Sequence, residues 1–290
     1  MKIEYGGIEK GYPHLPLHRR LKGYIQLLRP FTLLPALIAG IFLTIAPIKV
    51  FDFETLKIGI YAGVTLALLQ AVGQITNQYV DIELDKQIKS YRPLPSGIID
   101  RDEAIGLAWI LAIIAIARAF TLNLIFGSLS LVLLFLAVFY SLKPLSPRRH
   151  AFTSLTWQAF SRGFIPPIMC FSIYGSIYDG LPYSILAFIW ALGWQGSKDI
   201  TDIEGDRKFG ISTVANTYGV EFLKILSTIM TIVFTLASLH LHKPLFLIVS
   251  LLGVYGIMNY EKKSKLTENT ISWMVFYLGL GLIFLLAPFN

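Results

Sequence analysis

The chain has 290 residues, of which 54% are hydrophobic and 15% are charged, whereas a soluble domain carries about 25% charged residues. Together with a mean hydropathy of +0.62, this composition excludes an ordinary water-soluble globule. A net charge of +7 is also typical of nucleic-acid-binding proteins, but here apolar runs of bilayer length recur along the chain. We therefore expect a membrane protein with the lipid bilayer, and no nucleic acid, as its surroundings. The lone Cys170 excludes an intrachain disulfide and a thiolate metal cluster.

Nine apolar runs of membrane-spanning length follow one another in the sequence. They lie near residues 25–48, 56–81, 103–119, 123–141, 151–173, 181–202, 219–240, 244–260 and 270–288. A short turn around Thr121 and Asn123 separates the third run from the fourth, which leaves eight spans with one re-entrant piece as the alternative. The first 22 residues lack the apolar core and cleavage site of a signal peptide. The sequence predicts an all-α, polytopic membrane domain over 1–290 whose segment 1–22 is cytoplasmic.

The distribution of basic residues predicts the orientation of these spans. With nine spans, the N-terminus and the connections after the second, fourth, sixth and eighth spans share one side of the membrane. By count, 19 of the 25 lysines and arginines lie on that side and four on the other. Because basic residues concentrate in cytoplasmic loops, we expect that side to be cytoplasmic and the protein to be a multi-pass protein of the cell membrane.

Polar side chains form matching stripes on the second and sixth spans. The stripes consist of Gln70, Gln74, Asn77, Asp81 and Asp85 on the second span, and of Gln195, Asp199, Asp202 and Asp206 on the sixth. Steps of three and four residues keep each set on one side of an α-helix. Because an even number of crossings separates the two spans, both stripes run toward the cytoplasmic side, where we expect the five aspartates to converge on one cavity.

The cost of burying charge in lipid favours that cavity. A lipid-facing aspartate at the bilayer centre costs roughly 2.5–3.5 kcal/mol. A hard divalent cation offsets the repulsion among clustered carboxylates, and Mg²⁺ typically bridges one or two carboxylates to substrate phosphates. The alternative is a set of solvated loop charges balanced by Lys86, Lys89, Arg207 and Lys208, but the matched spacing of the two stripes argues against it. The sequence therefore predicts a Mg²⁺–phosphate site.

Basic and hydroxyl groups suited to diphosphate oxygens accompany the stripes. They are Lys86 and Arg92 after the first stripe, Lys198 and Arg207 in the second, and Tyr140, Ser141 and Lys143 after the fourth span. Arg162 lies in the middle of the fifth span, where an ionisable residue is a functional candidate and a structural ion pair is the alternative. Gly163, Pro166 and Pro167 follow it and predict a kinked helix that lines the site.

The stripes belong to two longer runs, residues 77–85 followed by 92–97, and residues 198–211. These runs resemble the first and second aspartate-rich motifs of the UbiA superfamily of intramembrane prenyltransferases. Tyr140, Ser141 and Lys143 resemble its tyrosine–serine element, and Arg29 with Pro30 resembles the start of its first helix. The likeness covers nearly the whole chain. It departs from the usual pattern at residue 78, where Gln replaces Asp, and at residues 89–91, where Lys-Ser-Tyr replaces Asn-Lys-Pro.

The resemblance implies nine helices around a central cavity, two Mg²⁺ ions, and transfer of a polyprenyl chain from an isoprenoid diphosphate to an acceptor. By this resemblance Asn77, Asp81 and Asp85 hold one ion, and Asp202 and Asp206 hold the other, with Asp199 as a further ligand or orienting group. The residues it implies for catalysis are Asp81, Asp202, Asp199 and Lys198, and those for the diphosphate are Lys86, Arg92, Tyr140, Ser141, Lys143 and Arg207. We expect Arg162, Gln74, Gln195 and Trp194 to line the acceptor side of the cavity.

The chemistry of such a transfer suits a cavity of this kind. Ionisation of an allylic diphosphate leaves negative charge on the leaving group, which Mg²⁺ and cationic side chains stabilise, and apolar walls keep water from the carbocation. The aromatic residues Phe164, Trp190 and Trp194 are candidates for facing that cation, and plain packing is the alternative.

The identity of the acceptor stays open at this stage. An aromatic head group of a quinone-type pathway is slightly favoured by residues 77–78 and 198–209, and geranylgeranylglyceryl phosphate is the alternative favoured by residues 92–97. An ion-coupled transporter is the rival class of protein. Transporters typically place such acids at the midplane of repeated halves, whereas here they lie at the cytoplasmic ends of helices.

Overall fold

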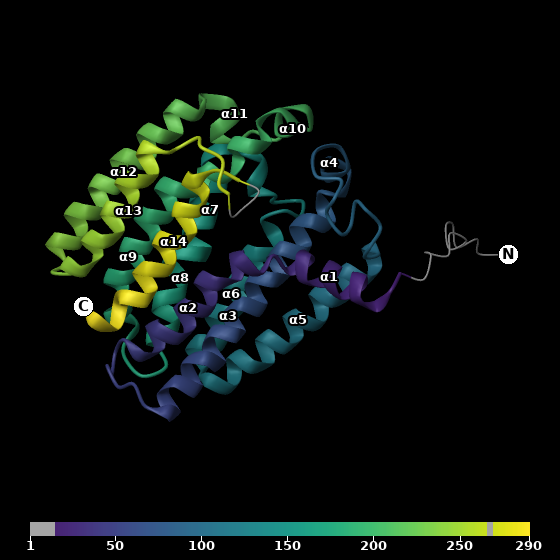
Figure 1. The fold of residues 1–290 in the computed structure, drawn as a ribbon. Coiled ribbons are helices and arrows are strands. Elements are labelled where there is room, and N and C mark those ends of the chain that lie inside the picture. Colours follow the sequence, from purple (N-terminus) through teal and green to yellow (C-terminus); the bar gives the residue numbers. More distant parts are fainter. Residues whose placement is uncertain (1–14, 266–268) are drawn as a thin grey trace.

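The computed structural model describes residues 15–265 and 269–290. Within these ranges the chain is helical throughout, apart from turns and one isolated bridge between Lys263 and Thr270. The principal helices are α2 (Pro30–Ile45), α3 (Phe53–Val80), α5 (Arg101–Leu122), α6 (Leu124–Phe139), α9 (Ile177–Trp194), α12 (Val220–His240), α13 (Leu247–Met258) and α14 (Ile271–Leu286). They pack side by side as a bundle (Figure 1), so the predicted all-α class is confirmed.

Short helices fill the connections and form parts of several predicted spans. They are α1 (Leu17–Leu28), α4 (Ile82–Ile88), η1 (Pro147–Arg149), α7 (Ala151–Ala159), η2 (Phe160–Phe164), α8 (Ile165–Phe171), η3 (Gln195–Asp202), α10 (Ile203–Lys208), α11 (Val214–Tyr218), η4 (Pro244–Phe246) and η5 (Ala287–Phe289). The fifth predicted span is thus α7, η2 and α8 in succession, and the sixth is α9 followed by η3.

The count of about nine transmembrane helices is not confirmed, although every predicted run contains helix. Among the described residues, four helices are long and apolar enough to cross a membrane by themselves: Phe53–Val80, Arg101–Leu122, Val220–His240 and Ile271–Phe289. The pair α1–α2, bent by 58°, makes a fifth if it is taken as one span. The remaining runs fall short in length or in apolar content.

The third and fourth predicted runs are two separate helices. The single residue Asn123 lies between α5 and α6, with an extended backbone, and its side-chain Oδ1 accepts a hydrogen bond from the backbone N–H of Phe126 at 2.7 Å. This interaction caps the N-terminus of α6. The two runs are thus two helices joined at Asn123.

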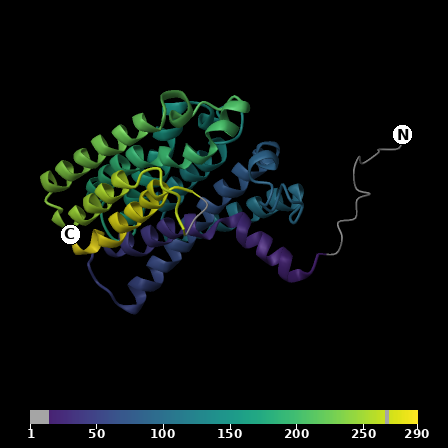
Figure 2. The same cartoon turned by 45° about the horizontal axis from the view of Figure 1, so that its top comes forward.

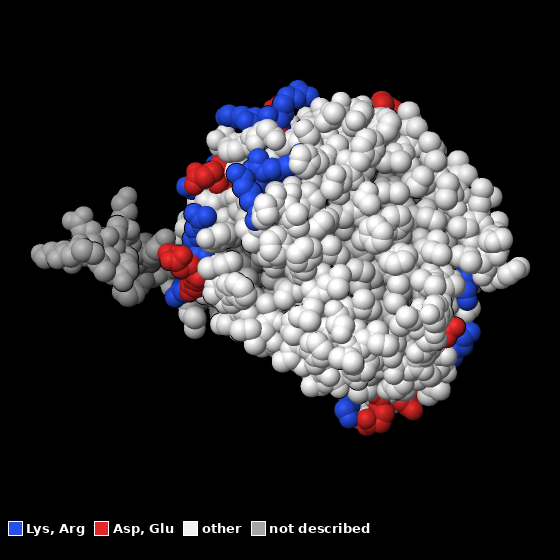
Figure 3. All heavy atoms as spheres, turned by 180° about the vertical axis from the view of Figure 1, so that it is seen from behind, with Lys and Arg blue, Asp and Glu red and all other residues white. Residues whose placement is uncertain are grey.

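The outside of the bundle is apolar between two charged ends. Trp109, Leu124, Leu251 and Met258 are 66–76% exposed, and exposed apolar surface of this extent marks a membrane-facing protein. In Figure 3 the charged side chains gather at two ends of the molecule, with a wide uncharged band between them. The lipid bilayer is the natural surrounding of that band.

Close packing between α2 and α3 brings the first polar stripe near the centre of the bundle. A Cβ atom on Gly40 would lie 2.1 Å from the Cα atom of Gly63, so the two helices approach as closely as backbone allows, as small residues permit in membrane helix pairs. At the end of α3 the chain continues into α4. Figure 1 shows α4, α10 and α11 at the same end of the bundle, which places both aspartate-rich segments there.

The helix α1 leaves the bundle at that same end and has two different faces. Its outer face exposes Leu17, Leu21 and Ile25, while Gly23 packs against Ile98 and Ile99. Figure 2 shows this purple helix extending away from the rest of the molecule. It ends at Arg29, whose left-handed backbone (φ 54°) turns the chain into α2.

Candidate active site

One cavity is lined by both aspartate-rich segments. Its volume is about 200 Å³. The polar residues contributed by these segments are Gln70, Gln74, Asn77, Asp81 and Asp85 from α3 and α4, with Lys198, Asp199, Asp202 and Asp206 from η3 and α10. The structure therefore brings all five aspartates to one space, although more than a hundred residues separate the two segments in sequence.

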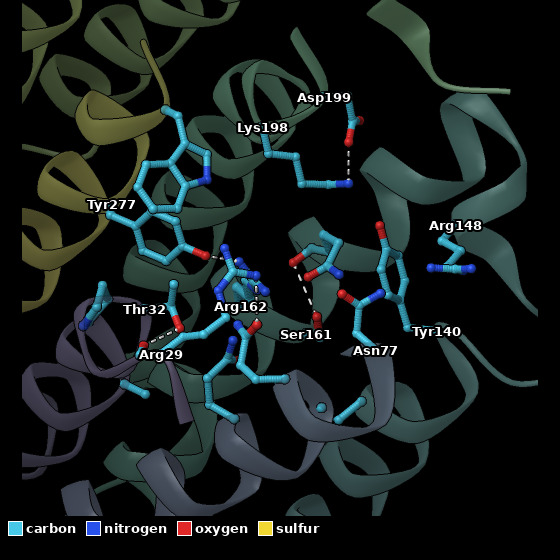
Figure 4. Close-up of a pocket in the computed structure, with 18 of the residues that line it drawn as sticks. Arg29, Thr32, Asn77, Tyr140, Arg148, Ser161, Arg162, Lys198, Asp199 and Tyr277 are labelled. Carbon is cyan, nitrogen blue, oxygen red and sulfur yellow. Dashed lines mark hydrogen bonds and ion pairs between the residues drawn. The ribbon is translucent and has the colours of Figure 1, made fainter. Parts of the chain in front are cut away.

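Four of the five carboxylates form ion pairs with one basic side chain each. The pairs are Asp81 with Arg148, Asp85 with Arg92 at 2.8 Å, Asp199 with Lys198 at 2.6 Å, and Asp202 with Lys89 at 2.6 Å. All eight residues line the cavity, and Figure 4 shows the pair of Lys198 and Asp199 and the nearby Arg148. The cavity therefore contains its own counter-ions.

Asp206 is the fifth carboxylate, and within the described ranges it forms no ion pair. Burial raises the pKa of Asp206 to about 7, and the negative charges of Asp199 and Asp202 contribute to the shift. Burial likewise raises the pKa of Asp85, against the opposing effect of the Arg92 guanidinium. A cation that enters the cavity would therefore stabilise the ionised form of these two carboxylates.

The backbone of the first segment explains how its polar groups reach the cavity. The α3 helix ends at Val80, and Asp81 joins it to α4 with φ −93° and ψ 9°. The side-chain amide of Asn77 donates to Asp81 Oδ2 at 2.9 Å and to Ser141 Oγ at 3.2 Å. These two hydrogen bonds hold the Asp81 carboxylate beside the end of α6.

The second segment is a 3₁₀ helix in place of the predicted α-helix, and this changes which residues face the cavity. Four residues correspond to a rotation of about 40° in an α-helix but about 120° in a 3₁₀ helix. Gln195 is thereby turned away from Asp199. It does not line the cavity, contrary to expectation, because it follows Trp194 directly at the end of α9 and is buried in the core. Among the described residues its Oε1 has no hydrogen-bond partner.

Several other residues predicted for the site lie outside the cavity lining. Lys86 pairs with Glu83 at 2.8 Å on the surface, Arg207 donates to the backbone oxygen of Asn216 at 3.3 Å, and Lys143 is exposed. Ser141 does not line the cavity itself and instead contacts Asn77, which does. For Lys86, Lys143 and Arg207 the reason is the same: their positions on short helices or turns direct long side chains toward water.

The tryptophans belong to the core. Trp190 and Trp194 stack with ring centroids 5.3 Å apart, and their indole N–H groups donate to the Phe276 carbonyl and to Thr231 Oγ1, at 3.0 and 3.2 Å. Trp194 is thus not on the acceptor side, where it was expected. Phe164 packs against Phe160 and Phe188, so the packing alternative holds for all three aromatic candidates.

Tyr140, Gln74 and Arg162 do line the cavity. The Tyr140 hydroxyl forms a hydrogen bond with Ser154 Oγ at 2.8 Å, and its ring lies 5.8 Å from Lys198 Nζ. Arg162 donates to the Tyr277 hydroxyl at 2.5 Å, as Figure 4 shows, and Arg29 donates to Gln74 Oε1 at 3.3 Å. Two arginines therefore face the side of the cavity away from the aspartates of the second segment.

Arg162 lies in a π-helical turn, within the run for which the sequence predicts a kinked helix. The η2 turn over Phe160–Phe164 joins α7 to α8, and such turns are frequent at functional sites. A Cβ atom at Gly163 would lie 2.6 Å from the Ala187 carbonyl oxygen. Glycine thus lets this turn press against α9 while Arg162 points into the cavity.

Lys89, Arg148 and Tyr277 were missed by sequence reasoning. Lys89 and Arg148 were interpreted as loop charges that set the orientation of the protein, and Tyr277 was part of an apolar run. Nothing local in the sequence distinguishes Lys89, which lines the cavity, from Lys86, which does not. For Arg148 the only signal is its proximity to the tyrosine–serine element.

The part of the cavity lined by α2, α3, α6 and α14 is largely apolar. It is lined by Pro35, Ala36, Ala39, Leu66, Leu69, Leu133, Leu136, Leu280 and Phe284. A hydrocarbon chain is the kind of group that such a wall accommodates, next to a charged part suited to an anion.

The donor groups of the cavity fit a hard cation. The described lining residues offer carboxylate and amide oxygens and no sulfur or imidazole, and oxygen atoms are the ligands that Mg²⁺ prefers. In the described part of the chain, however, no three acidic, histidine or cysteine side chains are arranged to hold a metal ion, and four of the carboxylates are paired with lysine or arginine instead.

Comparisons with known proteins identify the class. The family model described as the UbiA prenyltransferase family matches residues 32–286. Digeranylgeranylglyceryl phosphate synthase of Methanothermobacter thermautotrophicus is 27% identical over 276 residues, which cover 90% of this chain and 93% of that protein. A probable homogentisate phytyltransferase 2 of Oryza sativa is 32% identical over 181 residues, covering 56% of this chain and 46% of its own.

A solved structure shares the fold. The UbiA homologue from Archaeoglobus fulgidus, bound to DMAPP and Mg²⁺, superposes with a TM-score of 0.66 at 18% identity, covering 92% of this chain and 97% of that one. These matches define an all-helical, integral membrane prenyltransferase. The protein belongs to the UbiA prenyltransferase family, which confirms the resemblance found in its aspartate-rich motifs.

Proposed function

We propose that the protein transfers a polyprenyl chain from an isoprenoid diphosphate to an acceptor within the membrane and that it depends on Mg²⁺. The observation that supports this most directly is the composition of one cavity: five aspartates with their four basic partners line one part of it, and apolar residues of α2, α3, α6 and α14 line another. An isoprenoid diphosphate likewise has a charged head group and an apolar tail. The solved A. fulgidus homologue, with DMAPP and Mg²⁺ bound, is consistent with it.

In this proposal the aspartates hold the metal. Asn77, Asp81 and Asp85 form one ligand set, and Asp202 and Asp206 form the other, with Asp199 beside them, so that two ions are expected. Bound Mg²⁺ would supply Lewis-acid stabilisation of the diphosphate leaving group. The donor chemistry described above supports hard cations at both sets.

The basic side chains beside the aspartates bind the diphosphate. They are Lys89, Arg92, Arg148 and Lys198, and Tyr140 holds a place beside Lys198. Charge-assisted hydrogen bonds from lysine and arginine to phosphate oxygens are among the strongest in proteins. The apolar residues from α2, α3, α6 and α14 exclude water from the carbocation formed when the allylic C–O bond breaks.

For the acceptor, we infer an aromatic molecule with an acidic group, as in quinone-type pathways. Arg29 and Arg162 line the cavity away from the second aspartate segment, and the rings of Trp273 and Tyr277, 4.9 Å apart, line it beside them. Arginine suits an acidic group, and the two rings suit a flat one.

Geranylgeranylglyceryl phosphate is the second candidate acceptor. It is favoured by the digeranylgeranylglyceryl phosphate synthase relative, which aligns over 90% of this chain, whereas the homogentisate-type relative aligns over 56%. Its phosphate also suits Arg29 and Arg162.

The experiment that decides between the acceptors uses purified protein in lipid nanodiscs with geranylgeranyl diphosphate and Mg²⁺. Phenolic acids, hydroxynaphthoates and geranylgeranylglyceryl phosphate are supplied one at a time, and products are identified by mass. We expect a prenylated aromatic acid. A product formed from geranylgeranylglyceryl phosphate alone would replace the aromatic assignment, and no prenylated product from any acceptor would contradict the proposed transfer.

A further inference from the structure

Lys89 connects the two aspartate-rich segments. It follows α4 directly, in the first segment, yet its Nζ lies 2.6 Å from Oδ2 of Asp202 in the second segment, 113 residues further on. Their side chains are 15% and 22% exposed. Among the described residues, the other carboxylate pairs of the cavity do not join the two segments.

The backbone around Lys89 is held in place by contacts between α4 and α10. Gly205 lies against Ile88, such that a Cβ atom there would be 3.1 Å from the isoleucine side chain. Lys208 Nζ donates to Gln87 Oε1 at 2.7 Å. The two short helices that carry Asp85 and Asp206 therefore touch, and Lys89 reaches across their contact to Asp202.

An ammonium group on Asp202 competes with a metal ion for the same carboxylate oxygens. A nearby positive charge also repels an incoming cation, and this repulsion is strong in a site that is mostly shielded from water. A lysine side chain can move readily from Asp202 to another anion, because its ammonium is a compact charge on a flexible stem. A diphosphate in the cavity would offer it more negative charge than a single carboxylate does.

We propose that Lys89 is a resident counter-cation that occupies the second aspartate segment until donor arrives and then binds the diphosphate, so that metal binding at Asp202 is coupled to donor binding. The inference rests on the proposed function, since it assumes a metal site at the aspartates. It assigns Lys89 two opposite effects: it weakens the binding of a divalent cation alone, and it strengthens the binding of donor with metal.

Mn²⁺ binding in the absence of donor tests the first effect. Detergent-purified wild type and Lys89→Gln are titrated with Mn²⁺, and free ion is measured by electron paramagnetic resonance. We expect Lys89→Gln to bind Mn²⁺ about tenfold more tightly, because one repelling charge is removed. Lys86→Gln is the matched control: it removes a lysine from the adjoining helix α4 but outside the cavity, and should match wild type. Lys89→Arg, which keeps the charge, should also match wild type.

Donor binding tests the second effect. With Mg²⁺ saturating, a non-hydrolysable analogue of geranylgeranyl diphosphate should bind Lys89→Gln about tenfold more weakly than wild type, since a charge-assisted hydrogen bond is lost. If Lys89 served only to hold α4 against α10, its replacement by glutamine would weaken the binding of both Mn²⁺ and the donor analogue. Unchanged or weaker Mn²⁺ binding by a folded Lys89→Gln overturns the inference, while Mn²⁺ binding by none of the proteins contradicts the metal site of the proposed function itself.

Discussion

Asp206 differs from the other aspartates of the cavity at the scale of single residues. Its neighbours Asp199 and Asp202 each have a lysine partner, while burial and these neighbours raise the pKa of Asp206 to about 7. A carboxyl whose pKa is raised above its usual value of 3.8 stabilises the folded protein while it keeps its proton. That contribution is lost as the pH rises through about 7.

This difference predicts a pH-dependent stabilisation by Mg²⁺. Metal binds the ionised carboxylate, which is the form that destabilises the metal-free protein at higher pH. The increase in melting temperature caused by Mg²⁺ in detergent should therefore be larger at pH 8 than at pH 6, and Asp206→Asn should reduce the difference. An equal increase at both pH values would contradict the role of Asp206 in metal binding.

Arg162 carries a second prediction at this scale. If its guanidinium holds the acidic group of the acceptor, Arg162→Gln should raise the acceptor KM about tenfold to a hundredfold, as loss of a charged hydrogen bond does. The KM for the isoprenoid diphosphate should stay near that of wild type, because the basic residues beside the aspartates are intact. Equal losses for both substrates, measured by initial rates, would assign Arg162 a structural role instead.

The sequence predicts the acidic half of the cavity better than its basic half. Asp81, Asp85, Asp199, Asp202 and Asp206 were found because helical periodicity restricts where a run of polar residues points. Partners such as Lys89 and Arg148 depend on how distant segments pack, and their local sequence holds no equivalent pattern. This is why Lys86 and Lys143 were selected, although both point toward water.

At the scale of elements, irregular helices position the functional groups. The π turn η2 directs Arg162 into the cavity, and the 3₁₀ helix η3 carries Lys198, Asp199 and Asp202. Neither could be predicted from the sequence, because the apolar periodicity of a regular α-helix fits both runs. The error at Gln195 arises in this run, where a regular α-helix was assumed from span to loop and the chain instead changes from α9 to η3 at this residue.

Gly163 tests the importance of the π turn. Its Cα lies so close to α9 that an added Cβ would be 2.6 Å from the Ala187 carbonyl oxygen, and overpacking of this kind costs about 1–3 kcal/mol. We expect Gly163→Ala to lower the melting temperature in detergent. Gly106→Ala is the matched control in α5, where nothing lies within 4 Å of the added Cβ, and it should be neutral or slightly stabilising. Equal behaviour of the two variants would show that η2 tolerates displacement.

At the scale of the whole molecule, the apolar band and the charged ends are what the composition predicted. Because the chain has few charged residues, the position of each one is informative. Of the 25 basic residues, 19 fall on one predicted side of the membrane. The aspartate-rich segments lie at the end of the bundle that carries α4 and α10 (Figure 1). The number of spans was harder to predict, because hydropathy alone does not show where a helix bends, as α1 and α2 do by 58°.

Cysteine labelling tests the proposed cytoplasmic orientation. Lys57 lies near the start of α3, Lys86 lies in α4 beyond its other end, and both are exposed. In intact cells a membrane-impermeant maleimide should label Lys57→Cys, and it should label Lys86→Cys only after permeabilisation. The native Cys170 is buried, so wild type serves as the unlabelled control. The reverse pattern would place the aspartates on the outer side.

The central claim is that two aspartate segments act together, through Mg²⁺, on one isoprenoid diphosphate. Its most direct test is the Mg²⁺-dependent release of inorganic diphosphate from geranylgeranyl diphosphate in nanodiscs, with acceptor present. Asp81→Asn and Asp202→Asn should each lower the rate about a hundredfold or more while remaining folded. Asp52→Asn, which keeps the cap at the opposite end of α3, should match wild type. Turnover at the wild-type rate in either cavity variant, or in the absence of divalent cations, would contradict the claim.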